Sequence, residues 1–170
     1  MTKPWVVIPE VISSPASLIE LHTKELLDKS AHASPGETRI VDGRQLLDEA
    51  VENAVADAFK RAADITGIEY STIERISILR YRRGGEYSWH ADNELVEGRE
   101  RKLSMVISLN TGYEGGGTEF MWPRPGCSEI VKLPAGDAVV FPSFLYHRGR
   151  VTISGERWII VAWADGVPFR

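Results

Sequence analysis

The sequence predicts an α+β chain, mainly β, in which N-terminal helices brace a core of antiparallel strands. Apolar residues recur at helical spacing as far as Gly67. Beyond it they form short alternating or β-branched runs, separated by turns rich in Gly and Pro. This pattern is typical of a sandwich or barrel, and a jelly roll is the expected form. One domain is expected over residues 1–170, with helical support over about 14–67 and the β core over about 73–165.

Two helices are predicted before Gly67. The first occupies "SSPASLIELHTKELLDKS", with Ser14 as the N-cap and Pro15 as the first helical residue, and ends near Ser30. The second occupies "GRQLLDEAVENAVADAFKRAADITG", residues 43–67, with Gly67 as its C-terminal stop. Its apolar residues recur at a spacing that predicts one buried face, formed by Leu47, Ala50, Val51, Ala54, Ala58 and Ala62.

Strands are predicted in the rest of the chain. In "RKLSMVISLN", alternate positions place Leu103, Met105, Ile107 and Leu109 on one face. "TIERISILRY" alternates more loosely, and "EIVKL", "DAVVFP" and "RWIIVAW" are short β-branched or aromatic runs. The segments "GGG", "PRPG", "PAGD" and "SGE" separate these runs and are expected to be turns.

Charge and composition argue against several classes of protein. The net charge of −4 disfavours a nucleic-acid binder held by phosphates, so we expect no nucleic-acid partner. The single cysteine, Cys127, excludes an intramolecular disulfide and a cysteine-based zinc site, and fits a reducing compartment. The N-terminal residues carry no long apolar run, so we expect no membrane span and a cytoplasmic protein. His22 and His32 lie among polar residues and are expected to be exposed. The oligomeric state is left open.

The segment "YSWHADNEL" contains a candidate pair of metal ligands. In an extended strand residues i and i+2 share a face, so His90 and Asp92 would present an imidazole and a carboxylate to one point. His-x-Asp also arises by chance, and a single further histidine is ordinary in a core. With His147, however, the pair would complete the two-histidine, one-carboxylate triad of non-haem Fe(II) oxygenases.

Arg157 is the candidate anion-binding residue. Ser154 and Gly155 suggest a tight hairpin turn, which would bring Arg157 back toward the strand of His147. Arg157 shares its strand face with apolar residues, and a buried arginine there needs an anion. The guanidinium fork suits a carboxylate, either of 2-oxoglutarate or of a nearby Asp or Glu. Spacing alone leaves both partners open.

Three blocks together resemble the prolyl 4-hydroxylase-like Fe(II)/2-oxoglutarate dioxygenases. "RYRRGGEYSWHAD" is similar to the family's Arg-Tyr-x-x-Gly-x-x-Tyr-x-x-His-x-Asp signature. "RKLSMVISLNTGYEGGGTEF" is similar to its second block, and "LPAGDAVVFPSFLYHRGRVTISGERWIIVAW" to its third. The last block particularly resembles bacterial members named for a prolyl- and lysyl-hydroxylase-type domain. The resemblance spans roughly residues 76–163, in order and at the family's spacings.

The resemblance implies a double-stranded β-helix, in agreement with the jelly roll, and a set of cofactors. His90, Asp92 and His147 match the three iron ligands. Fe(II), 2-oxoglutarate and O₂ are the implied cofactor and cosubstrates, with ascorbate as a candidate reductant. Related halogenases have a small residue in place of the aspartate, so Asp92 favours hydroxylation.

Other matched positions imply roles in cosubstrate and substrate binding. Arg157 and Tyr81 match the residues that hold the distal carboxylate of 2-oxoglutarate. Trp163 matches an aromatic wall behind the iron site, and Tyr87 a tyrosine near the substrate, although core packing would also suit these aromatic residues. Gly117 departs from the family, which commonly has Glu there, and this puts substrate contacts in doubt.

The implied reaction is hydroxylation of an unactivated C–H bond, most simply that of a prolyl residue in a peptide or protein. A free amino acid or another small molecule is the alternative substrate, and a non-catalytic β-helical metal-binding module is the alternative to an enzyme. Trp89, Asn93 and Trp122 are candidate substrate contacts. The polar loop between Asp92 and Leu103 is a candidate lid.

Overall fold

The structure is a computed structural model that describes residues 2–23, 28–29 and 36–169. Its helices are α1 (Pro15–Thr23) and α2 (Glu49–Thr66). The larger sheet contains the strands β1 (Val6–Ile8), β2 (Asp28–Lys29), β4 (Asp42–Gln45), β5 (Thr72–Ile73), β6 (Ser77–Tyr81), β8 (Leu95–Val96), β9 (Arg99–Ser108), β13 (Ala138–Pro142) and β16 (Arg157–Gly166). The other strands are β3 (Arg39–Ile40), β7 (Glu86–His90), β10 (Glu114–Gly115), β11 (Thr118–Met121), β12 (Ser128–Val131), β14 (His147–Gly149) and β15 (Thr152–Ser154).

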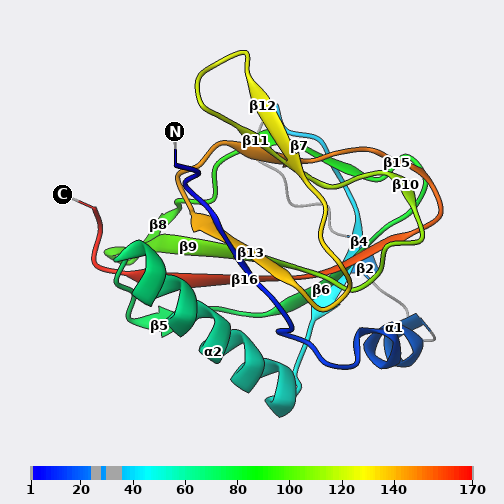
Figure 1. Cartoon of the computed structure of the whole chain (residues 1–170), viewed down its shortest axis with the longest axis horizontal. Helices are drawn as coiled ribbons and strands as arrows, with labels where there is room; N and C mark the ends of the chain where they lie inside the picture. Colours follow the sequence, from blue (N-terminus) through cyan, green and yellow to red (C-terminus); the bar gives the residue numbers. More distant parts are fainter. Residues whose placement is uncertain (1, 24–27, 30–35, 170) are drawn as a thin grey trace.

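Two antiparallel sheets face each other and form the core (Figure 1). The nine-stranded sheet has the order β1-β13-β9-β16-β6-β4-β2, with β5 beside β16 and β8 beside β9. The five-stranded sheet has the order β12-β11-β14-β7-β3, and β10 pairs separately with β15. This arrangement confirms the predicted mainly β, α+β class with a jelly-roll core.

Helix α2 covers the outer face of the larger sheet (Figure 1). Asp48 caps its N-terminus, with the carboxylate accepting a hydrogen bond from the Val51 N–H at 3.0 Å. Gly67 ends it in the left-handed region with φ 70°, as predicted. The buried face of the helix packs into one apolar cluster with the larger sheet and consists of Val51, Val55, Ala58, Phe59 and Ala62.

Alternation along β9 and β16 gives the larger sheet two different faces. Leu103, Ile107 and Ile160 point into the cluster with α2. Their neighbours Ser104 and Ile159 point the other way and line a pocket between the sheets. The strand pattern predicted for residues 103–109 is therefore confirmed, and the opposite face of the same strands forms one wall of the pocket.

The second helix begins later than predicted, because residues 42–45 form β4 instead of its first turn. Gly43 lies opposite Leu79 of β6, and a Cβ at Gly43 would approach Leu79 Cδ2 to 2.4 Å. Glycine at this position leaves room for the Leu79 side chain against the strand. Leu47 precedes the helix and is 77% exposed, and Ala50 is also exposed, so neither belongs to the buried face.

The first helix is shorter than predicted, and one histidine was assigned wrongly. Asp28 and Lys29 pair with β4, so the helix does not continue to Ser30. His22 is only 4% exposed, and burial lowers its pKa. The predicted exposure of His22 is therefore wrong, whereas His32 lies outside the described residues.

The turn at Ser154 and Gly155 joins two sheets instead of forming a hairpin. Gly155 has φ 73°, and the chain leaves β15, which pairs with β10, to enter β16 in the larger sheet. Arg157 therefore reaches the pocket because β16 crosses to the larger sheet. Neither of the described helices is both long and apolar enough to cross a bilayer.

We expect Phe59→Ala to lower the free energy of unfolding by about 3–5 kcal/mol, because it leaves a cavity between α2 and the sheet. Phe59 is fully buried in that cluster. Urea unfolding measures the change, and Lys60→Ala at the exposed neighbouring position is the control. A loss below about 1 kcal/mol would contradict the packing of α2 described above.

Candidate metal centre

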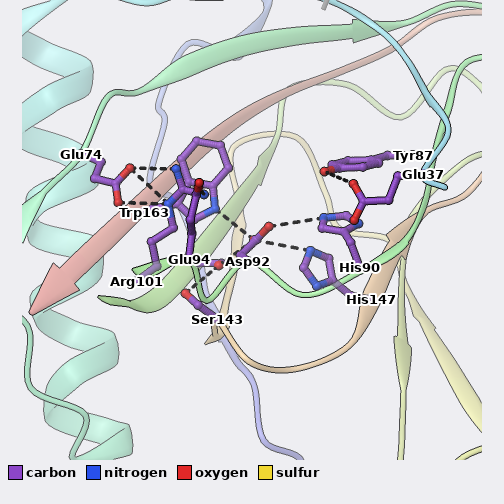
Figure 2. A network of polar contacts seen from close by, with 11 residues as sticks. Glu37, Glu74, Tyr87, His90, Asp92, Glu94, Arg101, Ser143, His147 and Trp163 are labelled. Carbon is purple, nitrogen blue, oxygen red and sulfur yellow. Dashed lines mark hydrogen bonds and ion pairs between the residues drawn. The ribbon is translucent and has the colours of Figure 1, made fainter. Parts of the chain in front are cut away.

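Three side chains converge where β7 meets β14. His90 ends β7, His147 begins β14, and the two are direct Cα partners in the antiparallel ladder. Asp92 follows two residues after His90, and its carboxylate lies 3.3 Å from Nε2 of His90 and 3.5 Å from Nε2 of His147. The three ligand atoms lie within 4.8 Å of one another, so this group could hold a metal ion (Figure 2).

Both imidazoles are oriented by backbone carbonyls. Nδ1 of His90 lies 2.7 Å from the Ser88 carbonyl, and Nδ1 of His147 lies 2.8 Å from the Leu145 carbonyl. Because a carbonyl oxygen only accepts, each Nδ1 carries a proton, and each Nε2 is the ring nitrogen directed at Asp92 and left for a metal ion. Burial lowers the pKa of His147, which favours the neutral ring that metal ligation requires.

Asp92 is held by hydrogen bonds to one of its two oxygens. Oδ2 accepts from Ser104 Oγ at 2.7 Å and from Trp163 Nε1 at 3.0 Å. Ser104 Oγ also lies 2.9 Å from Ser143 Oγ. The hydrogen bonds from the Ser104 hydroxyl and the Trp163 N–H favour the ionised form of this buried carboxylate. The carboxylate is thus available as an anionic ligand.

A bulge in β7 places Tyr87 beside His90 on the pocket side. His90 pairs with His147 and Tyr87 pairs with Gly149, so a separation of three residues on β7 lies opposite a separation of two residues on β14. The Tyr87 ring therefore stacks on His90 with centroids 3.7 Å apart. Its hydroxyl donates to Glu37 at 3.2 Å, and Arg39 of β3 lies over the ring. Burial, followed by the neighbouring Glu37, raises the pKa of Tyr87.

Arg157 lies deep in the same pocket, opposite Tyr81. The two are Cα partners on β16 and β6, and the guanidinium carbon is 5.3 Å from the Tyr81 ring centroid. Arg157 is 4% exposed and donates to Thr118 Oγ1 at 3.0 Å. Its Nε has no hydrogen-bond partner, and no carboxylate of the described residues lies within 4.0 Å of it. A structural pair with Asp or Glu is therefore absent from the described part of the chain.

The structure brings together seven of the predicted site residues. Tyr81, Tyr87, His90, Asp92, His147, Arg157 and Trp163 all line one pocket, together with Arg39, Leu79, Ser104, Met105, Val106, Thr118, Arg148, Gly149, Ile159 and Val161.

Of the four residues predicted near the substrate, Tyr87 lines this pocket and the other three do not. Trp89 stacks on Tyr146, with ring centroids 5.8 Å apart, and lies under Arg148. Trp122 packs beside the cluster that contains Phe120, and Asn93 is exposed.

The predicted lid is largely a β-hairpin. In the ladder of β8 and β9, Leu95 lies opposite Glu100. The Glu94 carboxylate also forms an ion pair with Arg101 at 3.3 Å. These contacts tie the segment after Asp92 to the larger sheet, so the polar composition of this segment does not make it an unanchored loop.

Sequence reasoning missed Ser104, Thr118 and Arg39. Ser104 and Thr118 stand inside two of the quoted blocks, where alternation with apolar neighbours could have placed them toward the pocket. No local signal marked Arg39, because it reaches the pocket only through the pairing of β3 with β7. Gly117 has φ 98°, a left-handed conformation that favours glycine at this position.

A model of the 2OG-Fe(II) oxygenase superfamily matches residues 76–165, more than half of the chain. The chain belongs to this superfamily. Fe(II), 2-oxoglutarate and O₂, the predicted cofactor and cosubstrates, are those of the family. The recognised family is therefore confirmed.

Curated relatives within this superfamily are PKHD-type hydroxylases. One from Picosynechococcus sp. is 33% identical over 123 residues, 71% of this chain and 54% of the relative. One from Maricaulis maris is 30% identical over 162 residues, 88% of this chain and 73% of the relative. The chain thus spans about half the length of the first of these relatives.

Solved structures of prolyl hydroxylases share the fold of this superfamily member. The viral collagen prolyl hydroxylase of Paramecium bursaria Chlorella virus-1, in its 2-oxoglutarate complex, superposes with a TM-score of 0.74 at 19% identity, covering 97% of each chain. A prolyl-4-hydroxylase of Pseudomonas putida superposes with a TM-score of 0.75 at 20% identity, covering 97% of this chain and 94% of that one.

Glu119 is a buried carboxylate that holds the strand next to His147. It lies opposite Arg148 in the ladder of β11 and β14. Its oxygens accept from Ser128 Oγ at 2.6 Å and Arg148 Nε at 2.7 Å, and Arg150 Nε lies 3.4 Å away. Burial opposes ionisation of Glu119, but these donors outweigh it and lower its pKa.

We expect Glu119→Gln to lower the free energy of unfolding at pH 7 by about 1–3 kcal/mol, because it leaves two guanidinium groups without their anion. A carboxyl whose pKa is lowered by folding stabilises the fold above its ordinary pKa, here 4.5, and loses this effect as the pH falls through the folded-state pKa. Urea unfolding across this pH range measures the difference from the unmodified protein. Glu114→Gln on an exposed strand is the control, and a difference that does not shrink in acid contradicts the assignment.

Proposed function

We propose that the chain is a single catalytic domain, an Fe(II)- and 2-oxoglutarate-dependent hydroxylase whose iron is bound by His90, Asp92 and His147. The convergence of these three side chains carries the proposal. Two imidazoles whose Nδ1 atoms are bound by backbone carbonyls and whose Nε2 atoms are directed at one carboxylate match the donor set of the facial triad in non-haem Fe(II) oxygenases. The donor set therefore fits the metal that the family uses.

Arg157, Tyr81 and Thr118 are proposed to bind the distal carboxylate of 2-oxoglutarate. The support is a buried guanidinium that faces the pocket and lacks an acidic partner among the described residues. Leaving such a cation unpaired is costly, so a carboxylate that enters the pocket is strongly favoured. The fork of Arg157 can meet both oxygens, and the Tyr81 hydroxyl can donate a further hydrogen bond.

The remaining pocket residues protect and orient the reactants. When bound, Fe(II) with 2-oxoglutarate and O₂ supplies the oxidising power that replaces a C–H hydrogen by hydroxyl. Leu79, Val106, Ile159 and Val161 form apolar walls that exclude water from the pocket. Asp92 stays ionised and occupies a ligand position, which favours transfer of hydroxyl over transfer of a halide.

A prolyl residue in a peptide or protein is the proposed substrate. The support comes from the names of similar proteins: a collagen prolyl hydroxylase, and a prolyl hydroxylase from Trichoplax adhaerens in complex with a peptide fragment. A free amino acid or another small carboxylic acid is the second candidate. It is favoured by Arg39, which adds a guanidinium to the pocket wall beside Tyr87.

We expect the purified chain to release succinate from 2-oxoglutarate in the presence of Fe(II), O₂ and ascorbate. Asp92→Ala and His147→Ala should each reduce this turnover at least about 100-fold, because each removes a metal ligand. Asp165→Ala is the control, since that carboxylate pairs with Arg99 outside the pocket. Turnover of Asp92→Ala at the level of the unmodified protein would rule out the proposed triad.

Arg157→Met should raise the KM for 2-oxoglutarate about 30-fold or more, corresponding to a loss of about 2 kcal/mol or more for a buried charge pair. Initial rates at varied 2-oxoglutarate measure this, and Arg157→Lys should retain part of the affinity. Arg82→Met is the control: it removes an arginine charge at an exposed position and should leave the KM for 2-oxoglutarate unchanged. An unchanged KM in Arg157→Met would exclude Arg157 from the cosubstrate site.

Mass spectrometry of proline-containing peptides and free amino acids, incubated in parallel with the enzyme, identifies the substrate class. The proposal expects a gain of one oxygen atom on a prolyl residue of a peptide. Oxygen incorporation into free amino acids alone would replace it with the second candidate. Matched reactions with His147→Ala exclude oxidation by free iron.

A further inference from the structure

We propose that Arg101 is a positioning residue of the metal centre: by stacking on Trp163 it holds the indole N–H on Asp92 and fixes the orientation of this carboxylate toward His90 and His147. This inference rests on the proposed function, since it concerns the same ligand set. Arg101 does not line the pocket, and neither its stacking nor its link to Asp92 can be read from the spacing of the sequence.

The guanidinium of Arg101 is fixed at its edges and presents a face to Trp163. Nε and Nη2 donate to the Glu74 carboxylate at 2.9–3.1 Å, and Nη1 lies 3.3 Å from Glu94. Its carbon lies 4.6 Å from the Trp163 ring centroid, within the range of a cation–π contact. The side chain of Arg101 is only 23% exposed, so these contacts are partly shielded from water.

Glu74 also binds the backbone of Trp163 on β16. Its N–H donates to the Trp163 carbonyl at 2.8 Å, while its carboxylate holds Arg101 over the Trp163 ring. Trp163 is therefore fixed both at its backbone and at its indole face. Figure 2 shows the Arg101 side chain between Glu74 and the Trp163 indole. This double attachment limits rotation of an indole that is not fully buried.

The indole in turn determines the orientation of the Asp92 carboxylate. Trp163 and Ser104 are Cα partners on β16 and β9, and both donate to Oδ2 of Asp92. With Oδ2 engaged twice, the carboxylate is held so that Oδ1 lies 3.3 Å from His90 Nε2 and Oδ2 lies 3.5 Å from His147 Nε2. A carboxylate torsion is broad on its own, so these two donors select one orientation.

Arg101 also connects the ligand to the segment that follows it. The Glu94 N–H donates to the Asp92 carbonyl at 2.7 Å, and the Arg101 N–H donates to the Glu94 carbonyl at 3.3 Å. Displacement of Arg101 would therefore loosen Asp92 through its side chain and through its backbone. A purely structural arginine would stabilise the β8–β9 hairpin without affecting the metal.

Mn(II) affinity distinguishes these two roles without relying on turnover. Free Mn(II) is measured by its EPR signal in titrations of the full chain with 2-oxoglutarate present. Trp163→Phe keeps the ring but loses the N–H, and should weaken Mn(II) binding about 10-fold. Arg101→Met should weaken binding in the same direction, and Arg101→Lys less, because lysine keeps the charge but not the flat face. The double variant Arg101→Met/Trp163→Phe should bind no more weakly than Trp163→Phe alone, within about 2-fold.

Arg99→Met is the matched control, because Arg99 lies on the same strand and pairs with Asp165 and Thr72 but not with Trp163. It should bind Mn(II) like the unmodified chain, and thermal unfolding without metal shows how each variant affects the fold. Lower stability of Arg101→Met with unchanged Mn(II) affinity would overturn the positioning role. The role would also be overturned if the losses of Mn(II) affinity in Arg101→Met and Trp163→Phe multiplied in the double variant. Should Arg101→Met not fold, Arg101→Lys and its double variant with Trp163→Phe are judged by the same criteria. Failure of the unmodified chain to bind Mn(II) would instead contradict the proposed function.

Discussion

Antiparallel pairing of β7 with β14 is the constraint on which the site depends, because it makes His90 and His147 direct partners although they are far apart in the chain. The same ladder, through its bulge, turns Tyr87 toward His90. Backbone carbonyls of Ser88 and Leu145 then orient the two rings. A strand pairing, rather than a local motif, thus creates the two histidine positions of the candidate metal centre.

The larger sheet serves the core and the pocket at once. One face of β9 and β16 packs against α2 through residues such as Ile107 and Ile160, and the other presents Ser104, Arg157 and Trp163 to the pocket. Because the helix face is apolar and fully buried, it fixes the strands against slippage. Ser104 and Trp163 on the opposite face can therefore be held at hydrogen-bond distance from Asp92. The same face carries Arg157, a cation that lacks an acidic partner among the described residues.

The sequence predicted the fold class and most of the pocket because both depend on short-range signals. Alternation placed Leu103, Met105 and Ile107 on one face, and the fixed offsets of three blocks identified the family and the residues that now line one pocket. It failed where pairing partners are distant: β4 replaced the start of a helix because residues 42–45 pair with β6, and β3 brought Arg39 to the pocket. His22 was judged by its polar neighbours along the chain, although the surrounding fold buries it.

The two-sided character of β16 has a consequence for how the length of this chain can change. Insertion of one residue after Arg157 would shift the register of the rest of the strand by one residue. Trp158 and Ile160 would then exchange faces with Ile159 and Val161. The core and the pocket would then fail together, whereas most single replacements on either face disturb only one of them. We therefore expect natural length variation to be excluded from β16 and to collect in exposed turns such as residues 123–126.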